Sequence, residues 1–367
     1  MVESIFFWLL ITFCSIYILL HSLLWKGMKK LFKTQFQQEQ LPISIIIAAR
    51  NEENSIGKLL ESLACQEYPS DKFEIIVVND RSTDSTATII GSFVKQHSNV
   101  RLINIDSNNS DMPNKKNALR IGITQSSFDI LGFTDADCVV PKQWLTEISK
   151  QYIDDVGVVA GYSPYNNEET NSFLRYEEYK NSLYAASAIE LHNAYMCTGR
   201  NFSYRKSVYN EVGGFEEIKN SMSGDDDLFL QLVQKKTNWK IRYMIVSDSY
   251  VLTIPPKSFS QFVNQRTRHV SASNYYPLQI KLAYSSVHLF HLCIALGFFF
   301  TPFFSLIALV VKFNIDALFI TKGKYFFTEV FSLLEFIIDE ILLVLYSFFI
   351  APLGFVRKFD WKGTSNQ

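Results

Sequence analysis

Residues 42–63 read PISIIIAARNEENSIGKLLESL, and residues 74–86 read EIIVVNDRSTDST. Ile43–Ala48 and Glu74–Val78 are continuous runs rich in β-branched residues, which is typical of strands covered on both faces. The segment between these runs repeats isoleucine and leucine at helical spacing. A strand, a helix and a second strand in this order predict a parallel sheet with crossover helices.

The same alternation continues further along the chain. We expect a weaker strand at Val100–Ile105, a helix around Asn117–Thr124 and another strand at Ile130–Phe133. Up to the tyrosine pair that precedes Pro277, the composition is that of an ordinary soluble α/β protein. We therefore predict one α/β domain over residues 41–276.

The composition excludes several classes of function. Lysine and arginine number 35 against 36 aspartates and glutamates, and no Arg-rich or aromatic-interleaved basic stretch is present, so we expect no nucleic-acid partner. The 5 cysteines are scattered and form no C-x-x-C pair. We therefore expect neither a disulfide framework nor a zinc site, and we expect a reducing, cytosolic setting.

The N-terminal residues are predicted to anchor the chain in a membrane. Ile5–Leu24 carries no Asp, Glu, Lys or Arg and is about long enough to cross a bilayer. Four lysines follow it closely: Lys26, Lys29, Lys30 and Lys33. Because a cleaved signal peptide would carry its positive charges before the apolar run, we expect an uncleaved anchor over 1–25 and a basic juxtamembrane linker over 26–40. Because positive charges stay on the cytoplasmic side, the lysines predict a cytoplasmic catalytic domain. The alternative for the apolar stretch itself is a buried helix of a soluble protein.

Residues 284–352 are predicted to return to the membrane. Tyr284–Val311 is long enough for one tilted span, and Phe326–Pro352 is the candidate for another, followed by a tail over 353–367. The acidic residues of the second stretch must face a helix, an aqueous crevice or the interface, because charge in lipid is costly. We favour three spans in total, with a basic loop at Lys312–Lys324, and an interfacial or re-entrant helix is the alternative.

Polar clusters directly follow three of the predicted strands. They are Ala49-Arg50-Asn51-Glu52-Glu53, Asn79–Asp84 and Asp135-Ala136-Asp137. Ligands of open parallel sheets bind beyond the carboxyl ends of the strands. Asp135 and Asp137, two residues apart on an extended backbone, face the same way, and their charges repel unless a cation lies near. A divalent metal that bridges a diphosphate fits this pair, although an isolated D-x-D is also the pattern of a surface turn.

The three clusters, taken in order, resemble the family 2 glycosyltransferases. The strings quoted above and FTDADC, residues 133–138, carry this resemblance. It implies the GT-A fold, a Rossmann-like, mixed and mainly parallel sheet with helices on both faces, and a nucleotide-sugar donor. Asn79 stands where the family has the first acid of an acidic pair.

The resemblance also implies roles on the donor side. Asp80 would contact the nucleotide base, Asp135 the ribose or phosphate, and Asp137 a Mg²⁺ or Mn²⁺ ion. Lys116, next to Lys115, stands where the family has a basic residue and is assigned to the diphosphate, with a solvated lysine pair as the alternative. Four further residues are assigned to the donor: Ala49, Arg50, Asn51 and Glu53.

Motifs of the acceptor half continue the resemblance. MCTGRN at 196–201, SGDDDL at 223–228 and QRTRH at 265–269 resemble the family's G-x-N, acidic and Q-x-x-R-W motifs. Asp225 takes the position of the catalytic base, and successive carboxylates raise one another's pKa, as a base needs. The residues assigned to the acceptor or the diphosphate are Gly199, Asn201, Asp226, Gln265, Arg266, Arg268 and His269. His269 stands where the family has a tryptophan that offers the acceptor a stacking face.

We therefore predict an integral membrane protein that is an inverting glycosyltransferase. Its donor would be a UDP-linked sugar, and its acceptor lipid-linked or a glycan at the membrane. A nucleotidyltransferase uses a similar sheet and metal, but it would have a Gly-rich loop where this chain has AARNEENSIG. A second rival is a non-catalytic or partner-dependent subunit of a polysaccharide synthase that binds nucleotide sugar. The three acids Asp135, Asp137 and Asp225 argue against it, because a scaffold needs no base beside a metal.

Overall fold

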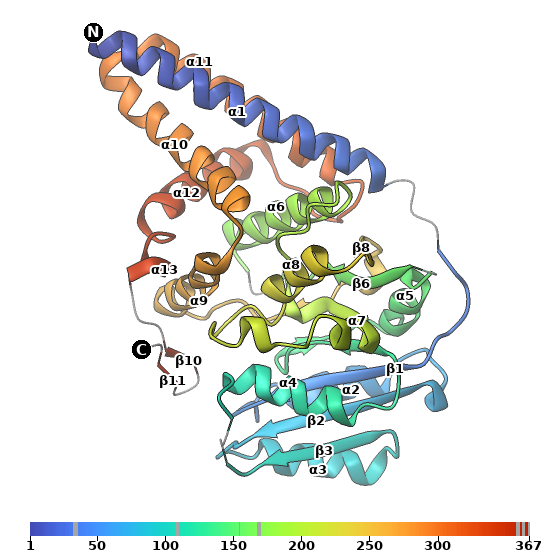
Figure 1. The fold of residues 1–367 in the computed structure, drawn as a ribbon. Helices are drawn as coiled ribbons and strands as arrows, with labels where there is room; N and C mark the ends of the chain where they lie inside the picture. The colour runs from blue at the N-terminus through green and yellow to red at the C-terminus, as the bar shows by residue number, and fades with distance from the viewer. Residues whose placement is uncertain are drawn as a thin grey trace.

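The computed structural model describes residues 1–31, 36–107, 110–153, 155–166, 170–356, 360–361 and 364–365. Lys33, which belongs to the predicted basic linker, and part of the predicted tail lie outside these residues. A sheet with helices on both faces forms one part of the protein, and long helices from both ends of the chain lie together at the other (Figure 1).

The central sheet has 7 strands in the order β3-β2-β1-β4-β7-β6-β8. Its strands are β1 Ile43–Ala49, β2 Phe73–Asp80, β3 Val100–Ile105, β4 Ile130–Phe133, β6 Val156–Gly161, β7 Phe202–Arg205 and β8 Lys240–Met244. Strands β1 to β4 run parallel, whereas β7 is antiparallel to both of its neighbours. The predicted α/β fold with a mixed, mainly parallel sheet is confirmed. Two small antiparallel pairs accompany the sheet: β5 Cys138–Val139 with β9 Leu252–Thr253, and β10 Asp360–Trp361 with β11 Thr364–Ser365.

Helices cover both faces of the sheet, which explains the continuous apolar run of β1. The side chains of Ile45 and Ile47 pack in one core with α2, whereas Ile46 packs with α4 in the core on the other face. The helices of this domain are α2 Ile56–Ala64, α3 Thr86–Gln96, α4 Asn114–Gln125, α5 Trp144–Gln151, α6 Ser172–Ile189, α7 Lys206–Glu211, α8 Asp227–Lys236 and α9 Phe259–Ala272. In this arrangement the carboxyl ends of β1, β2 and β4 meet at one edge.

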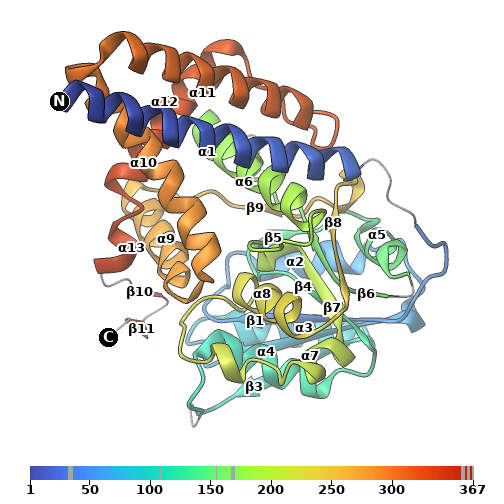
Figure 2. The same ribbon diagram turned by 45° about the horizontal axis from the view of Figure 1, so that its top comes forward.

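Three helices in the described part of the chain are long and apolar enough to cross a membrane. They are α1 Val2–Leu31, α10 Leu278–Phe300 and α11 Pro302–Gly323, and they lie side by side (Figures 1 and 2). α12 Leu333–Phe349 and the short α13 Leu353–Val356 follow them. α1 continues past the predicted end of the anchor, so Lys26, Lys29 and Lys30 belong to the helix and not to a linker.

The boundaries of the C-terminal helices differ from the prediction. The single span expected at Tyr284–Val311 is interrupted at Thr301, and Pro302 starts a new helix, where its missing N–H costs nothing. The predicted loop at Lys312–Lys324 is mostly the second half of α11. The expectation of a loop was wrong because the charges of Lys312 and Asp316 have buried partners in the fold.

These partners form a buried ion cluster, made of Lys180, Lys312, Asp316 and Glu340. Lys312 lies 2.7 Å from Asp316, Lys180 lies 3.4 Å from it, and Glu340 pairs with both lysines. Tyr17 of α1 also donates to Asp316 at 2.6 Å. Helix α6 of the sheet domain is therefore joined to α11 and α12 by charges that neutralise one another away from water, and α1 is tied to the cluster by the Tyr17 hydrogen bond.

Candidate active site

A large cavity of about 1020 Å³ lies at the carboxyl ends of β1, β2 and β4. Its wall brings together twelve of the predicted site residues: Ala49, Arg50, Asp80, Asp135, Asp137, Gly199, Asp225, Asp226, Gln265, Arg266, Arg268 and His269. Segments separated by more than 200 residues in the sequence thus meet at one place. Four predicted residues do not line it: Asn51, Glu53, Lys116 and Asn201.

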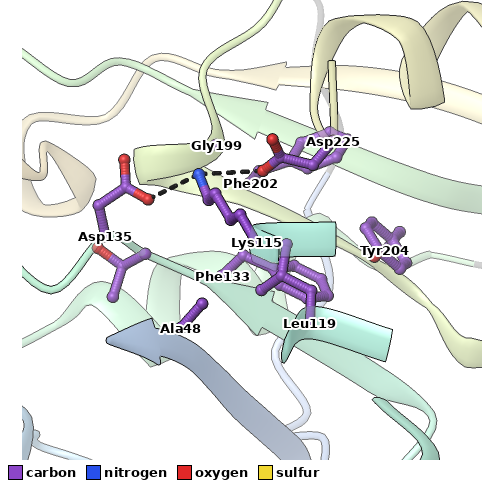
Figure 3. Close-up of a pocket in the computed structure, with 10 residues that line it drawn as sticks. Ala48, Lys115, Leu119, Phe133, Asp135, Gly199, Phe202, Tyr204 and Asp225 are labelled. Atoms are coloured by element: carbon purple, nitrogen blue, oxygen red, sulfur yellow. Dashed lines mark ion pairs between the residues drawn. The ribbon is translucent and has the colours of Figure 1, made fainter. Parts of the chain in front are cut away.

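Lys115 lies at the centre of the acidic part of the cavity (Figure 3). Its ammonium is 2.9 Å from Asp135 and 3.0 Å from Asp225. Burial by itself would lower the pKa of Lys115, but the carboxylates of Asp135, Asp225 and Asp226 outweigh this and raise it. Burial would likewise raise the pKa of Asp135, and the nearby Lys115 lowers it. The ammonium of Lys115 therefore lies between Asp135, the predicted donor-side acid, and Asp225, the predicted base.

Lys116, the neighbour that the sequence assigned to the diphosphate, has a different environment. Its side chain is fully buried, and its ammonium donates to the backbone carbonyls of Ile218, Ser221 and Ser223. Burial lowers the pKa of Lys116. Contrary to the assignment to the diphosphate, Lys116 does not line the cavity and Lys115 does, because the two side chains leave α4 in different directions.

Asn201, the second exception, is also internal. Its amide nitrogen donates to the carbonyls of Tyr162 and Ser249, each at 2.8 Å, and its carbonyl accepts from the Trp144 ring at 3.0 Å. Every polar atom of this side chain is thus used to join neighbouring segments. Gly199, two residues earlier, does line the cavity.

Asn51 and Glu53 tie together the loops that follow β1 and β2. The Asn51 side chain accepts from the Thr83 N–H at 2.8 Å, and Glu53 accepts from the Ser85 N–H at 3.0 Å. Asn51 has φ 53°, a left-handed conformation that asparagine tolerates better than most residues. Both residues therefore stabilise the loops beside the cavity from outside its wall.

Asp80 projects into the cavity from the end of β2 with two arginines beside it. The Arg81 guanidinium donates to its carboxylate at 2.7 and 3.2 Å, and Arg50 lies 3.9 Å away. Arg81 has φ 54°, which is costly for a long side chain. The turn thus holds the guanidinium against Asp80 at the expense of backbone strain, an arrangement typical of a ligand site.

The three successive aspartates follow Gly224, whose φ of +88° favours glycine. Asp226 caps α8 and accepts from the backbone N–H groups of Gly199 and Asp227, each at 2.8 Å. Asp227 accepts from the Leu228 N–H and from the hydroxyl of Tyr276. Burial and then the charge of Asp225 raise the pKa of Asp226, and burial and then Asp226 raise the pKa of Asp227 to about 8.

This pKa gives a test of the acidic cluster through stability. Because folding raises the pKa of Asp227 from 3.8 to about 8, the folded state binds this proton more tightly, and stability is lost as pH rises through 8. We expect Asp227→Asn to flatten the fall in melting temperature between pH 5.5 and 8.5, where the slope reaches about 1.4 kcal/mol per pH unit for one proton. Thermal unfolding in detergent measures it. Asp111→Asn, an exposed carboxyl, is the control, and an unchanged slope in Asp227→Asn would contradict the assignment.

Two arginines of α9, Arg266 and Arg268, line the cavity and have different hydrogen-bond partners. The Arg266 guanidinium donates twice to one carboxylate oxygen of buried Glu177, at 2.5 and 3.1 Å, which commits it to an internal ion pair. Arg268 lies beside His269, 3.1 Å from its Nε2. An arginine has only donors, so Nε2 accepts and Nδ1 carries the proton of the ring. Burial and the neighbouring arginines hold the pKa of His269 well below its usual value, so the ring is neutral.

Arg200 and Glu178 are cavity residues that the sequence analysis did not assign. The Arg200 guanidinium lies 2.9 Å from Glu178 and donates to the Thr198 hydroxyl at 2.9 Å. Arg200 occupies the middle position of the G-x-N motif, which is the only signal in the sequence. Glu178 comes from α6 and has no signal, because only the fold brings this helix to the cavity.

The donor set can be compared with the needs of a divalent metal. In the described ranges, no group of three or more His, Cys, Asp or Glu side chains is placed to hold a metal ion. Asp135 and Asp137 both line the cavity. Mg²⁺ is commonly held by one or two carboxylates together with substrate phosphates and water. The two aspartates therefore fit a metal that arrives with a diphosphate, and do not form a complete site alone.

The sheet order, the acidic pair after β4 and the cavity above it define a protein with the GT-A fold. Residues 132–353 match the family described as "Glycosyl transferase family group 2", and residues 44–213 match "Glycosyl transferase family 2". The first match covers more than half of the chain, so the chain belongs to the glycosyl transferase family group 2.

Individual proteins show the same relationship. The chain is 24% identical over 279 residues to the probable glycosyltransferase YdaM of Bacillus subtilis, covering 74% of this chain and 65% of that protein. It is 26% identical over 207 residues to a beta-monoglucosyldiacylglycerol synthase of Synechocystis, covering 55% of this chain and 42% of that protein. The chain thus spans less than two thirds of the length of these relatives.

A solved structure shares the fold over nearly the whole length. It is the mannosyltransferase PcManGT from Pyrobaculum calidifontis, in complex with GDP-Man and Mn²⁺. The TM-score is 0.60 at 17% sequence identity, with 95% of this chain and 97% of the other covered. A coverage of 95% extends into the long helices α1, α10 and α11, so the likeness in fold is not confined to the sheet.

Proposed function

We propose that this protein is a membrane-anchored glycosyltransferase that moves a sugar from a nucleotide diphosphate to an acceptor at the membrane. The observation that carries the proposal is the single cavity in which Lys115 lies within 3.0 Å of both Asp135 and Asp225. A donor site and a base that face one another are what a direct transfer needs. Family membership and the relatives named above support this reading.

The donor would lie over the ends of β1, β2 and β4. Asp80 would receive the nucleotide base, and Asp135 and Asp137 would face the ribose and the diphosphate. A divalent ion, Mg²⁺ or Mn²⁺, would be held by Asp137 and would neutralise charge on the departing nucleoside diphosphate. Lys115 and Arg268 add positive charge to the same region, and an arginine pairs well with phosphate oxygens. We favour a UDP-linked donor.

Asp225 is proposed as the base of the transfer. Its carboxylate would take the proton of the acceptor hydroxyl as that oxygen attacks the anomeric carbon of the donor. As the new bond forms, the bond from this carbon to the diphosphate breaks, and its electron pair leaves with the nucleoside diphosphate. Attack from the side opposite to the leaving group inverts the anomeric centre in one step.

The location of the reaction follows from the helices. α1, α10 and α11 would span the bilayer, and Lys26, Lys29 and Lys30 at the end of α1 favour a catalytic domain on the cytoplasmic side. The acceptor would then be lipid-linked or held at the membrane surface. We keep the predicted order of parts for this proposal: an anchor at 1–25, a catalytic domain at 41–276 and membrane segments at 284–352. The helices of the anchor and of the membrane segments have the boundaries given under Overall fold.

Release of nucleoside diphosphate by the full-length, detergent-purified protein tests the proposal. We expect one donor of a UDP- and GDP-sugar panel to be consumed with Mn²⁺, with at least a tenfold fall when the metal is chelated or when Asp137 is replaced in Asp137→Ala. Asp111→Asn, at an exposed aspartate that does not line the cavity, is the control. Binding of nucleotide without consumption of any donor, with or without added membrane lipid, would instead support the partner-dependent or scaffold role.

A further inference from the structure

The cavity does not end at the catalytic aspartates. Beyond them its wall continues along α10, where Lys281, Tyr284, Ser285, His288 and Leu289 line it. These positions recur at three and four residues, so they form one face of the helix. α10 begins just after Tyr276, whose hydroxyl donates to Asp227, and each turn of this face therefore leads further from the reaction centre.

A second wall stands opposite, on α12 and α13. Leu343, Tyr346 and Ser347 line the cavity from one face of α12, and Phe355 lines it from α13. Figure 1 shows α13 beside α9, which carries Arg268 and His269, so this wall also connects with the reaction centre. The cavity is thus bounded at this end by helices that belong to the membrane side of the protein.

The lining of this passage combines polar and apolar side chains. Tyr284 and His288 are followed on α10 by Leu289, with Leu343 and Phe355 on the other wall. Leu289 and Phe355 line the cavity and are also 42% and 58% exposed, so they lie at its mouth. The mouth opens among side chains that face lipid when α10 spans a bilayer, whereas a sugar chain arriving from water would meet a polar mouth.

We propose that this passage admits the acceptor sideways from the bilayer, and that the acceptor is a lipid whose headgroup is uncharged and presents a hydroxyl. This proposal rests on the function proposed above and names its acceptor. The choice of a hydroxyl rests on Asp225, which lines the same cavity and is the proposed base. A hydroxyl needs a base to accept its proton, whereas an ionised phosphate does not. The acyl chains would lie between α10 and α12–α13.

Photo-crosslinking tests the passage without requiring turnover. The full-length protein in nanodiscs would be labelled with diacylglycerol that carries a diazirine in one acyl chain, and adducts would be mapped by mass spectrometry. We expect saturable adducts on residues 284–289 and 343–347 that excess diacylglycerol displaces and phosphatidic acid does not. Adducts spread without saturation over the outer faces of the helices, or displaced equally by phosphatidic acid, would overturn the proposal.

A matched pair of tryptophan variants adds a functional readout. Ser285→Trp fills the passage, and Leu282→Trp places the same ring on an outward position of α10 that is 59% exposed and does not line the cavity. We expect Ser285→Trp to lower sugar transfer to diacylglycerol, relative to donor hydrolysis by water, at least tenfold and to lose the saturable adducts, with Leu282→Trp like the wild type. Equal behaviour of the two variants would overturn the passage. Failure of the proposed function is distinguishable, because it abolishes donor consumption and leaves the crosslinking readout intact.

Discussion

Asp225→Asn is expected to lower sugar transfer by about 1000-fold, within the range that a positioned base contributes. The substitution keeps the shape of the side chain and removes its ability to take a proton from the acceptor hydroxyl. Asp225 carries none of the capping hydrogen bonds of α8, which belong to Asp226. The fold should therefore survive, and nucleotide binding should stay within a few fold of the wild type.

The measurement is transfer by the purified variant with its preferred donor, together with nucleotide affinity and melting temperature. Asp111→Asn replaces an exposed aspartate whose carboxylate pairs with Lys219, and it should transfer sugar like the wild type. Transfer by Asp225→Asn within threefold of the wild type would remove Asp225 from the role of base. If the protein were a non-catalytic scaffold, Asp225→Asn would likewise leave its cellular role unchanged.

The neighbouring lysines of α4 are expected to respond in opposite ways to the same substitution. Lys115→Met removes the charge between Asp135 and Asp225, and we expect donor consumption per folded molecule to fall about 100-fold. A preorganised charge of this kind is worth about 3 kcal/mol in the transition state. Lys116→Met leaves three buried carbonyl groups without a donor, at about 1–3 kcal/mol each. We expect it to lower the melting temperature by about 10 °C.

Each variant serves as the control for the other, because the two share residue type, helix and substitution. Activity measured per folded molecule separates the effects, with the folded fraction taken from thermal unfolding and size-exclusion chromatography. A stable Lys116→Met that loses donor binding would restore Lys116 to the diphosphate. A Lys115→Met protein that is unstable but fully active when folded would make Lys115 a structural residue.

These two lysines also show where prediction from the sequence stops. The sequence places a basic pair before a helix, but one residue along a helix turns the side chain by about 100°, and the partners of Lys116 lie more than 100 residues away in the chain. Asn201 differs from its predicted role for the same reason, since its three partners come from separate segments. Residues that only the finished fold brings together have no local signal.

The strands and their polar ends could be predicted because their causes are local. Continuous β-branched runs indicated buried parallel strands, and the polar clusters that follow them line the cavity through Ala49, Arg50, Asp80, Asp135 and Asp137. The membrane-side helices were harder to delimit, because Lys312 and Asp316 look like loop residues until their partners are known. Glu178 could not be found from the sequence, since α6 is brought to the cavity by tertiary packing alone.

Helix α6 links the cavity to the buried ion cluster. One face of it lines the reaction cavity with Glu177 and Glu178, while Lys180 reaches the buried ion cluster and meets Glu340 and Asp316. Replacing Asp316 and Glu340 would leave Lys180 buried without its counter-charges, and a one-residue slip in α12 would turn Glu340 by about 100° away from it. Helix α6 therefore couples the lining of the cavity to the packing of α11 and α12, and a change in either of these helices must keep a counter-charge for Lys180.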